Sequence, residues 1–460
     1  MHPLVQATQV RLSDFGLLSV FGFRPSDLGL NEFVCIFSLV LFASATSASG
    51  TEEFPQLTLQ EAHETALRNH PLIHVSELKT LIAREVVQEV RSGFFPNLSA
   101  NVVAVGTAKD NTRLAAVGGL NNPAIFDRNA EGLMLSQLIS DFGRTANLTG
   151  SAKLQAEAAA NNAQATREQI LLAVDGAFYS ALQAQSVILV AEQTITNRQT
   201  FLDQVSELAK AQLRSSLDVS FARVNVEDAR LLLSKSENDL QAAFAQLSAL
   251  MGLREAKSYR LAEQALPPEL STNATDFVQQ ALTARPDLLS LRNQREAAFK
   301  FARGEKALSY PTISAVASAG VVPIHDPELP DNYAAAGVVL SVPLFAGGYY
   351  SARRDAALLQ AQADEESLHD LEDNVIRDVR VAWLNSQNAF ERYRITGQLL
   401  ENAKQSYELA QARYKQGISS IVEFNQAELN QVSAEISYAN TRYEYLVQRS
   451  ALSFQTGTLR

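Results

Sequence analysis

The 460-residue sequence predicts a mainly helical protein with a small β part, built from two tandem copies of one unit. Three features predict this class. Similar segments recur at a nearly constant offset, two long stretches contain no proline, and short segments alternate apolar residues with small or polar ones. The predicted unit is a short helix, a medium helix, a strand hairpin and a pair of long antiparallel coiled-coil helices.

An internal repeat sets the predicted domains. Residues near the start of the first copy align with residues about 215 positions later, and the rest align about 205 positions later, so one copy has a longer loop. The first copy is assigned to residues 55–252 and the second to residues 273–457, with strand hairpins at about 97–138 and 312–343. The aligned pairs include Ala66 and Ala281, Pro71 and Pro286, Pro96 and Pro311, Gly143 and Gly348, Phe178 and Trp383, and Gly252 and Gly457.

Prolines mark where the shorter helices of each copy end. Pro71 and Pro286 separate a short helix from a medium one, and Pro96 and Pro311 push the preceding residue out of the α region. Extended chain is therefore expected to begin at the second proline of each copy. The short and medium helices predicted in this way cover residues 58–69, 72–93, 273–284 and 287–308.

Strands are predicted after Pro96 and Pro311, because apolar residues there alternate with small or polar ones. The loop of the second hairpin is expected to hold Pro323, Pro327 and Pro330. Strands of this length match the about 9–11 residues that a tilted strand needs to cross a bilayer. A small sheet capping a soluble coiled coil is the alternative interpretation. The four strands cover residues 98–106, 131–138, 313–321 and 336–342.

Two stretches without proline predict unusually long helices. Residues 143–210 and 348–415 can each form one helix of about 68 residues, about 100 Å long at 1.5 Å per residue. Apolar residues recur along them at steps of three and four, as in coiled-coil seams, and only Arg198 breaks the seam of the first copy. A medium and a return helix together match one long helix in length. The two are therefore expected to stack end to end beside it.

A four-stranded sheet with free edges cannot sit in hydrocarbon, because each unpaired backbone group is costly there. The strands are therefore expected to contribute to a transmembrane β-barrel shared between copies, in contact with membrane lipid, and the long helices to an α-barrel. The aromatic residues beside the strands suit either an interfacial girdle or packing at the strand–helix junction. These residues are Phe94, Phe95, Phe142, Tyr310, Phe345, Tyr349 and Tyr350.

Composition and motifs argue against several classes of function. The formal net charge of −11 and the lack of clustered Lys and Arg argue against a nucleic-acid partner. No nucleophile elbow, zinc-protease motif or phosphate-binding glycine loop is present, so no catalytic site, cofactor or metal is predicted. His63, His70 and His74 have a spacing that could suit ligands, but Pro71 interrupts the helix between them. They are interpreted as surface histidines.

Residues 1–48 are interpreted as a signal peptide with an upstream extension. An apolar run from Phe33 to Phe42 precedes the small residues 43–48, and about ten residues are too few to span a bilayer as a helix. Cys35, the only cysteine, lies in this run, so the cleaved chain would contain no thiol.

The turn between each long helix and its return helix carries a family resemblance. ARYKQGISSIVEFNQAELN, at residues 412–430, resembles this turn in the TolC family of outer-membrane efflux proteins. LAKAQLRSSLDVSFARVNV, at residues 208–226, is the counterpart, with Gln212 where the family usually has glycine. LSVPLFAGG, at residues 340–348, resembles the family's passage from strand to long helix, and LISDFG has this place in the first copy.

The resemblance covers about residues 55–457 and implies a passive export duct in the outer membrane of a Gram-negative bacterium, with a large periplasmic part. It implies a homotrimer whose tip docks on a periplasmic adaptor, also called a membrane fusion protein. That adaptor would belong to an inner-membrane pump in a tripartite efflux or type I secretion system. The docking residues would be Gln212, Leu213, Ser215, Ser216, Gly417, Ile418, Ser419 and Ser420.

The resemblance also places aperture residues on the second turn. Acidic rings narrow the tip in the family, and the matching positions here are Glu423 and Gln426, so one ring is kept and one is neutral. Three Glu423 carboxylates around a narrow pore would favour cations. A solvated residue at a helix N-terminus is the alternative interpretation, and for Asp218 it is preferred over a role in the gate.

Two other classes remain as alternatives to an export channel. A secreted trimeric coiled-coil structural or adhesin-like protein would explain the heptads, but it needs neither the strand hairpins nor the repeat. An enzyme on a helical framework would need convergent polar groups, which the sequence does not show. The export channel is therefore the predicted function.

Overall fold

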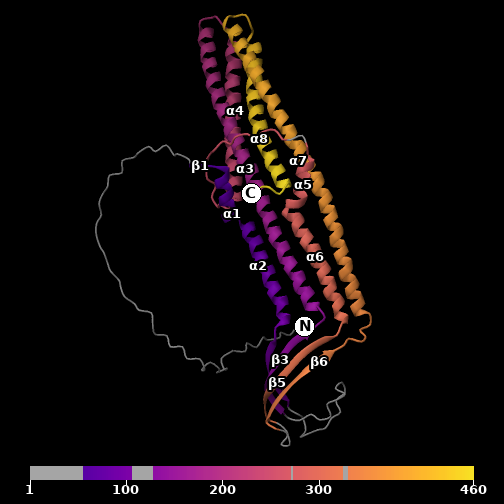
Figure 1. Ribbon diagram of the computed structural model, residues 1–460. Helices are drawn as coiled ribbons and strands as arrows, with labels where there is room; N and C mark the ends of the chain where they lie inside the picture. Colours follow the sequence, from indigo (N-terminus) through magenta and orange to yellow (C-terminus); the bar gives the residue numbers. More distant parts are fainter. Residues whose placement is uncertain (1–54, 106–127, 271–272, 325–329, 460) are drawn as a thin grey trace, which may run out of the picture. The chain divides into compact units, whose positions relative to one another are not determined.

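The computed structural model describes residues 55–105, 128–270, 273–324 and 330–459, so the interpreted signal peptide with Cys35 lies outside the described part. Long helices lie side by side there and lead at one end into a four-stranded sheet (Figure 1). The predicted class, mainly α with a small β part, is confirmed. None of the described helices has both the length and the apolar character needed to cross a membrane.

Each copy contributes four helices in the same order. The two long helices have 67 residues each and the two return helices have 35 each. The first copy has α1 (Leu59–Asn69), α2 (Pro71–Arg91), α3 (Arg144–Lys210) and α4 (Ser216–Leu250), and the second has α5 (Thr275–Ala284), α6 (Pro286–Lys306), α7 (Tyr349–Lys415) and α8 (Ile421–Gln455).

The helix ends follow the predicted prolines and glycines within a few residues. Single 3₁₀ turns, Ser92–Phe94 after α2 and Ala307–Ser309 after α6, complete these helices just before the extended chain. Gly143 and Gly348 were predicted to begin the long helices but precede them as N-caps, with φ of 93° and 84°. Glycine suits these caps because a positive φ is strained for residues with a Cβ.

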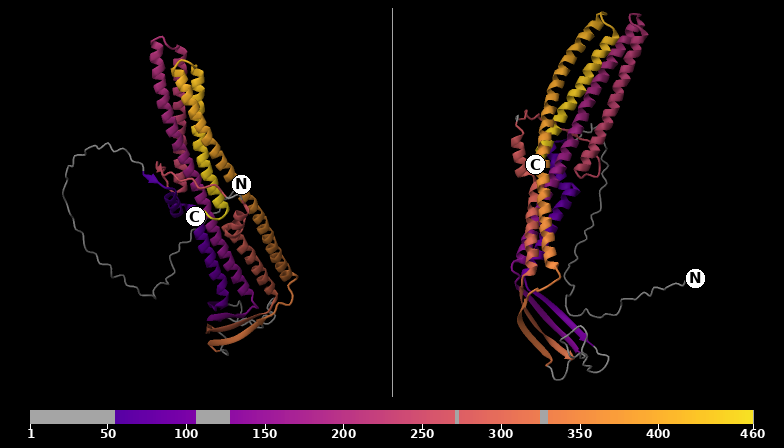
Figure 2. Two further views of the ribbon diagram at one scale, coloured as in Figure 1. Left: turned by 45° about the horizontal axis from the view of Figure 1, so that its top comes forward. Right: turned by 90° about the vertical axis from the view of Figure 1, so that its right-hand side faces the viewer.

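Helix α3 is the central element of the helical layer. Toward the sheet it packs against α2 and α6, and toward the opposite end it packs against α4 and α8, while α7 packs against α6 and α8. The order is thus α2, α3, α6, α7 near the sheet and α4, α3, α8, α7 at the far end (Figures 1 and 2). A medium and a return helix lie along each long helix, as their lengths predicted.

Two glycines form the joints between return and medium helices. Gly252 follows α4 with φ 72°, and a Cβ there would lie 2.6 Å from the carbonyl oxygen of Asn69, the last residue of α1, two residues before α2. Gly457 follows α8 with φ 69°, and its Cβ would lie 3.0 Å from backbone atoms of Ala284 and Arg285, directly before α6. Both positions therefore need glycine for conformation and for space.

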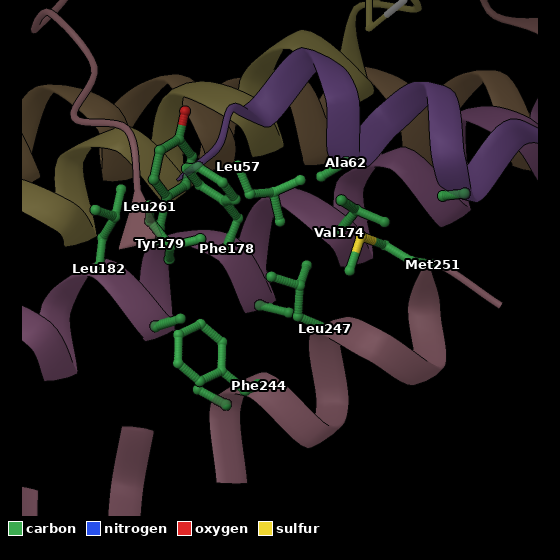
Figure 3. Close-up of a cluster of buried hydrophobic side chains, with 14 of the residues drawn as sticks. Leu57, Ala62, Val174, Phe178, Tyr179, Leu182, Phe244, Leu247, Met251 and Leu261 are labelled. Carbon is green, nitrogen blue, oxygen red and sulfur yellow. The ribbon is translucent and has the colours of Figure 1, made fainter. Parts of the chain in front are cut away.

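The largest hydrophobic core lies beside the first of these joints. Phe178 and Val174 of α3, Leu247 of α4 and Met251 pack together under α1 (Figure 3). Two-residue strands from outside the helices cover this core, and they are β1 (Gln56–Leu57) and β4 (Arg260–Leu261), paired in parallel. Such short strands have no sequence periodicity, so they were not predicted.

The sheet joins the two copies. It contains β2 (Asn97–Val105), β3 (Arg128–Ser140), β5 (Thr312–Ile324) and β6 (Asn332–Ser341), all antiparallel, in the order β2-β3-β5-β6. Its central pair, β3 and β5, comes from different copies.

The predicted strands are too short by three or four residues at three ends, because β3 begins at Arg128, β6 begins at Asn332 and β5 continues past residue 321. Pro323 was expected in the hairpin loop, but β5 continues to Ile324. Proline is tolerated here because the ladder with β6 already ends at Val321 and Asn332, so the missing N–H removes no bond to β6.

The long and return helices all end in the same kind of turn, with a residue in the left-handed conformation. Gly252, Gly417 and Gly457 take this position after α4, α7 and α8, whereas Gln212 takes it after α3 with φ 58°. Leu213 N–H donates to Leu208 O (2.8 Å), which closes the turn as in a Schellman motif. Gln212 therefore carries a strain that glycine avoids.

We expect Gly252→Ala and Gly457→Ala each to lower the free energy of unfolding, by on the order of 1–2 kcal/mol, because both positions combine positive φ with a backbone contact. Gly176→Ala is the matched control, because it lies within α3 and its Cβ would meet nothing within 4 Å. The control should raise helix stability by about 0.5–1 kcal/mol. Urea unfolding followed by circular dichroism measures all three, and equal effects would contradict the role of the joints.

The strain at Gln212 predicts a stabilising substitution. Gln212→Gly should slow amide hydrogen exchange in the helical hairpin of α3 and α4, because it removes a left-handed residue with a side chain. The free energy of local opening should rise by about 1 kcal/mol. Gly417→Gln is the reciprocal change and should speed exchange in the second hairpin. Faster exchange in Gln212→Gly would show that the glutamine side chain stabilises its turn.

Candidate functional site

The candidate site consists of the two turns that join a long helix to its return helix, α3 to α4 and α7 to α8, here called the hairpin tips. Every predicted docking residue lies in one of these turns or at the helix start that follows. Leu213 and Ile418 are equivalent in the two turns and are exposed to 70% and 64%. Ser215 and Ser420 are the N-caps of α4 and α8, with side chains that accept hydrogen bonds from Leu217 N–H and Glu423 N–H. The tips thus present polar caps and exposed apolar side chains.

One cation joins the two tips. Arg214 of the first turn donates from Nη2 to the carbonyl oxygen of Tyr414 in α7 (3.0 Å). Its guanidinium carbon also lies 4.3 Å from the centre of the Tyr414 ring, which is a cation–π contact. Burial raises the pKa of the Tyr414 hydroxyl and the charge of Arg214 opposes this shift, so the ring stays neutral under Arg214.

An aromatic cluster supports the second tip from beneath. Phe424 of α8 stacks on Phe201 of α3, with ring centres 4.5 Å apart, and on Tyr414 at 5.5 Å. Ile421 completes this core. Because Phe201 belongs to the first copy and the others to the second, the cluster holds the two hairpins together.

The predicted aperture residues lie at corresponding places in the two copies. Asp218 is the third residue of α4 and Glu423 is the third residue of α8, where the helix dipole favours a negative charge. Glu423 is exposed, and its Oε1 lies 3.6 Å from Arg413 Nε. Gln426 follows one turn later on the same side of α8 and donates to Asn430 Oδ1 (3.0 Å).

A groove of about 600 Å³ runs between the return helices α4 and α8, with α3 as its floor. Gln426 lines it, together with apolar residues such as Phe221 and Leu429. Arg198 forms part of the floor. Gln426, the second predicted aperture position, therefore lies where α8 of the second copy faces α3 and α4 of the first.

The structure adds a buried ion pair that the sequence did not predict. Arg198 Nε lies 3.4 Å from Glu428 Oε2, and both side chains are only 9% exposed. Arg198 also donates to the carbonyl oxygen of Asn225 (2.7 Å), whose side chain bonds Asn425 (3.1 Å). Burial raises the pKa of Glu428, and Arg198 opposes that shift. Arg198 interrupts the predicted apolar seam because it pairs with Glu428 of the other copy. This interruption was the one sequence signal from which the ion pair could have been predicted.

The interpretation of all three histidines as surface residues is wrong for His63. Its side chain is 13% exposed and its Nε2 lies 2.5 Å from Oδ1 of the buried Asp175 in α3. The reason is that α1 lies on α3, so His63 faces a carboxylate within the core. His70 caps α2 and His74 is exposed. In the part of the chain that the structure describes, no three His, Cys, Asp or Glu side chains gather as a metal site would need.

Known proteins share this sequence pattern and fold. The toluene efflux pump outer membrane protein TtgC of Pseudomonas putida is 23% identical over 405 residues, which is 85% of this chain and 81% of TtgC. The outer membrane protein TolC of Escherichia coli is 23% identical over 434 residues, which is 90% of this chain and 85% of TolC. A crystal structure of a membrane protein from Pseudomonas aeruginosa superposes with a TM-score of 0.73 and 21% identity, covering 87% of this chain and 93% of that protein.

The sequence also matches a family described as outer membrane efflux protein, once in each copy of the repeat. The matches cover residues 62–253 and 277–458, which together make up most of the chain. Because the same family pattern matches each half of the chain, the predicted internal repeat is confirmed. The chain is a member of the outer membrane efflux protein family.

Proposed function

We propose that three copies of this chain form a passive export duct through the outer membrane, docked at its tip by the periplasmic adaptor of an inner-membrane pump. One observation carries the proposal. The helical layer near the sheet, the helical layer at the far end and the sheet itself each have one outermost element from the first copy of the repeat and one from the second. These outermost elements are α2 and α7, α4 and α7, and β2 and β6.

The first edge near the sheet is α2. Ile73 and Thr80 are buried, and the Thr80 hydroxyl donates to Ala159 O of α3. Helix periodicity places Val75, Leu78 and Ile82 on the opposite side, where they are exposed. An apolar face directed away from the helix's own layer fits a further helix.

The second edge is α7. Near the sheet it exposes Ala356, Leu359 and Ala363 at steps of three and four, a spacing at which another helix can approach closely. At the far end, α4 exposes Leu217 and Leu231, two heptads apart. The layer near the sheet therefore has an exposed apolar face at both of its edges, and α4 gives the far layer one at its first edge.

The sheet has the same arrangement. β2 and β6 are its edges. One face is mostly apolar, with Leu98, Leu133 and Leu340, and the other is more polar, with Ser99, Asn101 and Ser318 beside Met134 and Val316. Lipid on the apolar face and water on the polar face suit this division. The exposed aromatics beside the sheet, above all Phe345 at 91%, support contact with lipid headgroups.

Edges that differ in sequence join head to tail, and a rotation that closes such a contact makes a ring. Pairing β2 with β6 of the next copy satisfies the edge backbone that hydrocarbon cannot. Three copies is the number that the family resemblance supports. TtgC, by its name, is an outer membrane protein of an efflux pump, which supports the same place for this chain.

The tip suits docking and a mild filter for charge. Leu213 and Ile418 are exposed at the tips, where an apolar partner surface can cover them. Glu423 would contribute a ring of carboxylates, but Arg413 beside it offsets part of the charge. Membership of a family described as outer membrane efflux protein supports an export channel over an adhesin-like coiled coil or an enzyme.

The edge contact predicts a matched pair of variants. Ile82→Glu should shift the detergent-extracted protein from the trimer to smaller species, because a charge would be buried between α2 and α7 of two copies. Gln88→Glu is the control, since it adds the same charge to α2 away from the apolar face. Light scattering after size-exclusion chromatography measures the mass. Full trimer in both variants would contradict this contact.

The aperture predicts changes in ion selectivity. Glu423→Gln should lower the preference for cations, and Gln426→Glu should raise it by adding a second acidic ring. Arg413→Gln should also raise it by freeing Glu423. Reversal potentials across planar bilayers in a KCl gradient measure this preference, and unchanged potentials in all three variants would place Glu423 outside the aperture. Asp218→Asn should have little effect.

A further inference from the structure

A row of four residues crosses the sheet near its loop end. Asn101 of β2 pairs with Gly132 of β3, Gly132 pairs with Gly320 of β5, and Gly320 pairs with Tyr333 of β6. Directly paired residues point to the same face of a sheet, so all four share one face. Gly132, Gly320 and Tyr333 lie in the halves of their strands that are remote from the helices, and Asn101 lies at the centre of β2.

The side chain of Tyr333 lies over both glycines. A Cβ at Gly132 would be 3.1 Å from Tyr333 Cζ and would overlap its hydroxyl oxygen. A Cβ at Gly320 would be 2.7 Å from the same hydroxyl oxygen, and it would also overlap the carbonyl oxygen of Glu131 and lie 2.7 Å from Gly132 Cα, so the backbone of β3 requires glycine there as well. The tyrosine ring therefore extends across two neighbouring strands along the sheet surface and does not stand away from it.

This arrangement explains two adjacent glycines in the middle of a sheet. Glycine weakens a strand because it adds no side chain to the packing, and an aromatic residue from a neighbouring strand can cover the gap. Gly337 of β6 is different, because a Cβ there would meet nothing within 4 Å. At Gly132 the missing side chain leaves room for the Tyr333 ring, and at Gly320 it leaves room for both the ring and the backbone of β3.

The face that carries Tyr333 is the more polar of the two, although Val103, Met134 and Val316 also lie on it. It holds Asn101 and, two residues along β5 from Gly320, Ser318, whereas the alternating positions Leu133 and Ala319 belong to the apolar face. In the proposed duct the polar face lines the water-filled pore. Tyr333 is then a pore-lining aromatic residue at the outer mouth, which is the end of the sheet remote from the helices.

We propose that Gly132 and Gly320 form a recess that holds Tyr333 flat against the pore wall, and that this recess sets the width of the outer mouth. The inference rests on the proposed duct. A flat ring adds only its thickness, about one van der Waals separation of 3.5–4 Å, to the wall of each copy. A raised ring would add its full length three times around the axis. The residue at position 132 thereby affects how far the Tyr333 ring projects into the outer mouth.

Four variants test this in planar bilayers, with the purified full-length protein. Gly132→Ala adds one methyl group that removes the recess under Tyr333 and also lies 2.9 Å from the carbonyl oxygen of Ala319, whereas Gly337→Ala adds the same group to the same face where nothing lies within 4 Å. Tyr333→Ala removes the ring. The double variant Gly132→Ala/Tyr333→Ala fills the recess when no ring is present. Single-channel conductance and exclusion of polyethylene glycols of increasing size are measured for each.

The expected results separate the ring from the methyl group. Gly132→Ala should lose conductance and exclude smaller polymers, Gly337→Ala should match the wild type, and the double variant should regain wild-type conductance. Tyr333→Ala should keep conductance near the wild type and should melt at a lower temperature, because both glycines lose their cover. This single variant retains the test if Gly132→Ala does not assemble.

Two results would overturn the inference. The first is an unchanged conductance in Gly132→Ala with a normal trimer mass, and the second is a large gain of conductance in Tyr333→Ala, which would show that the ring already stands in the pore. Failure of the wild-type protein to form channels would instead contradict the proposed duct. The wild-type recording therefore distinguishes the two failures.

Discussion

The backbone groups along the free edges of β2 and β6 constrain the whole protein. Hydrocarbon offers them no partner, and an unpaired peptide group costs several kcal/mol there, so the sheet must be completed by another chain. The two edges come from opposite copies of the repeat, which makes the contact head to tail and directs it toward a ring. Duplication therefore supplies two different edges, and more than one chain is needed to close them.

The helical layer follows the same rule with different means. Apart from α1 and α5, which pack on α3 and α7, it is one helix thick because a medium and a return helix share the length of each long helix, and the joints at Gly252 and Gly457 allow their ends to meet closely. The sheet and the helices then end in edges of the same origin, so one rotation can close both. Near the tips, the pairing of Arg198 with Glu428 links the copies through charge where a coiled-coil seam would use apolar residues.

Most of the fold could be predicted, because repeat, proline positions and heptads are all local or periodic signals. The two-residue strands β1 and β4, the extension of β5 through Pro323, and the burial of His63 could not, because each depends on a neighbour distant in sequence. At the site, the turn positions followed from the resemblance, whereas Arg413 beside Glu423 and Arg214 over Tyr414 required the structure. The row from Asn101 to Tyr333 depends on strand register across both copies, which no single segment reveals.

The central claim is that each copy is one segment of a closed wall. It is tested most directly by measuring the native mass of the protein extracted intact from outer membranes in detergent. The account predicts a particle of three chains and no stable smaller species. A monomer, or a two-fold dimer that buries the same edge on both chains, would contradict it.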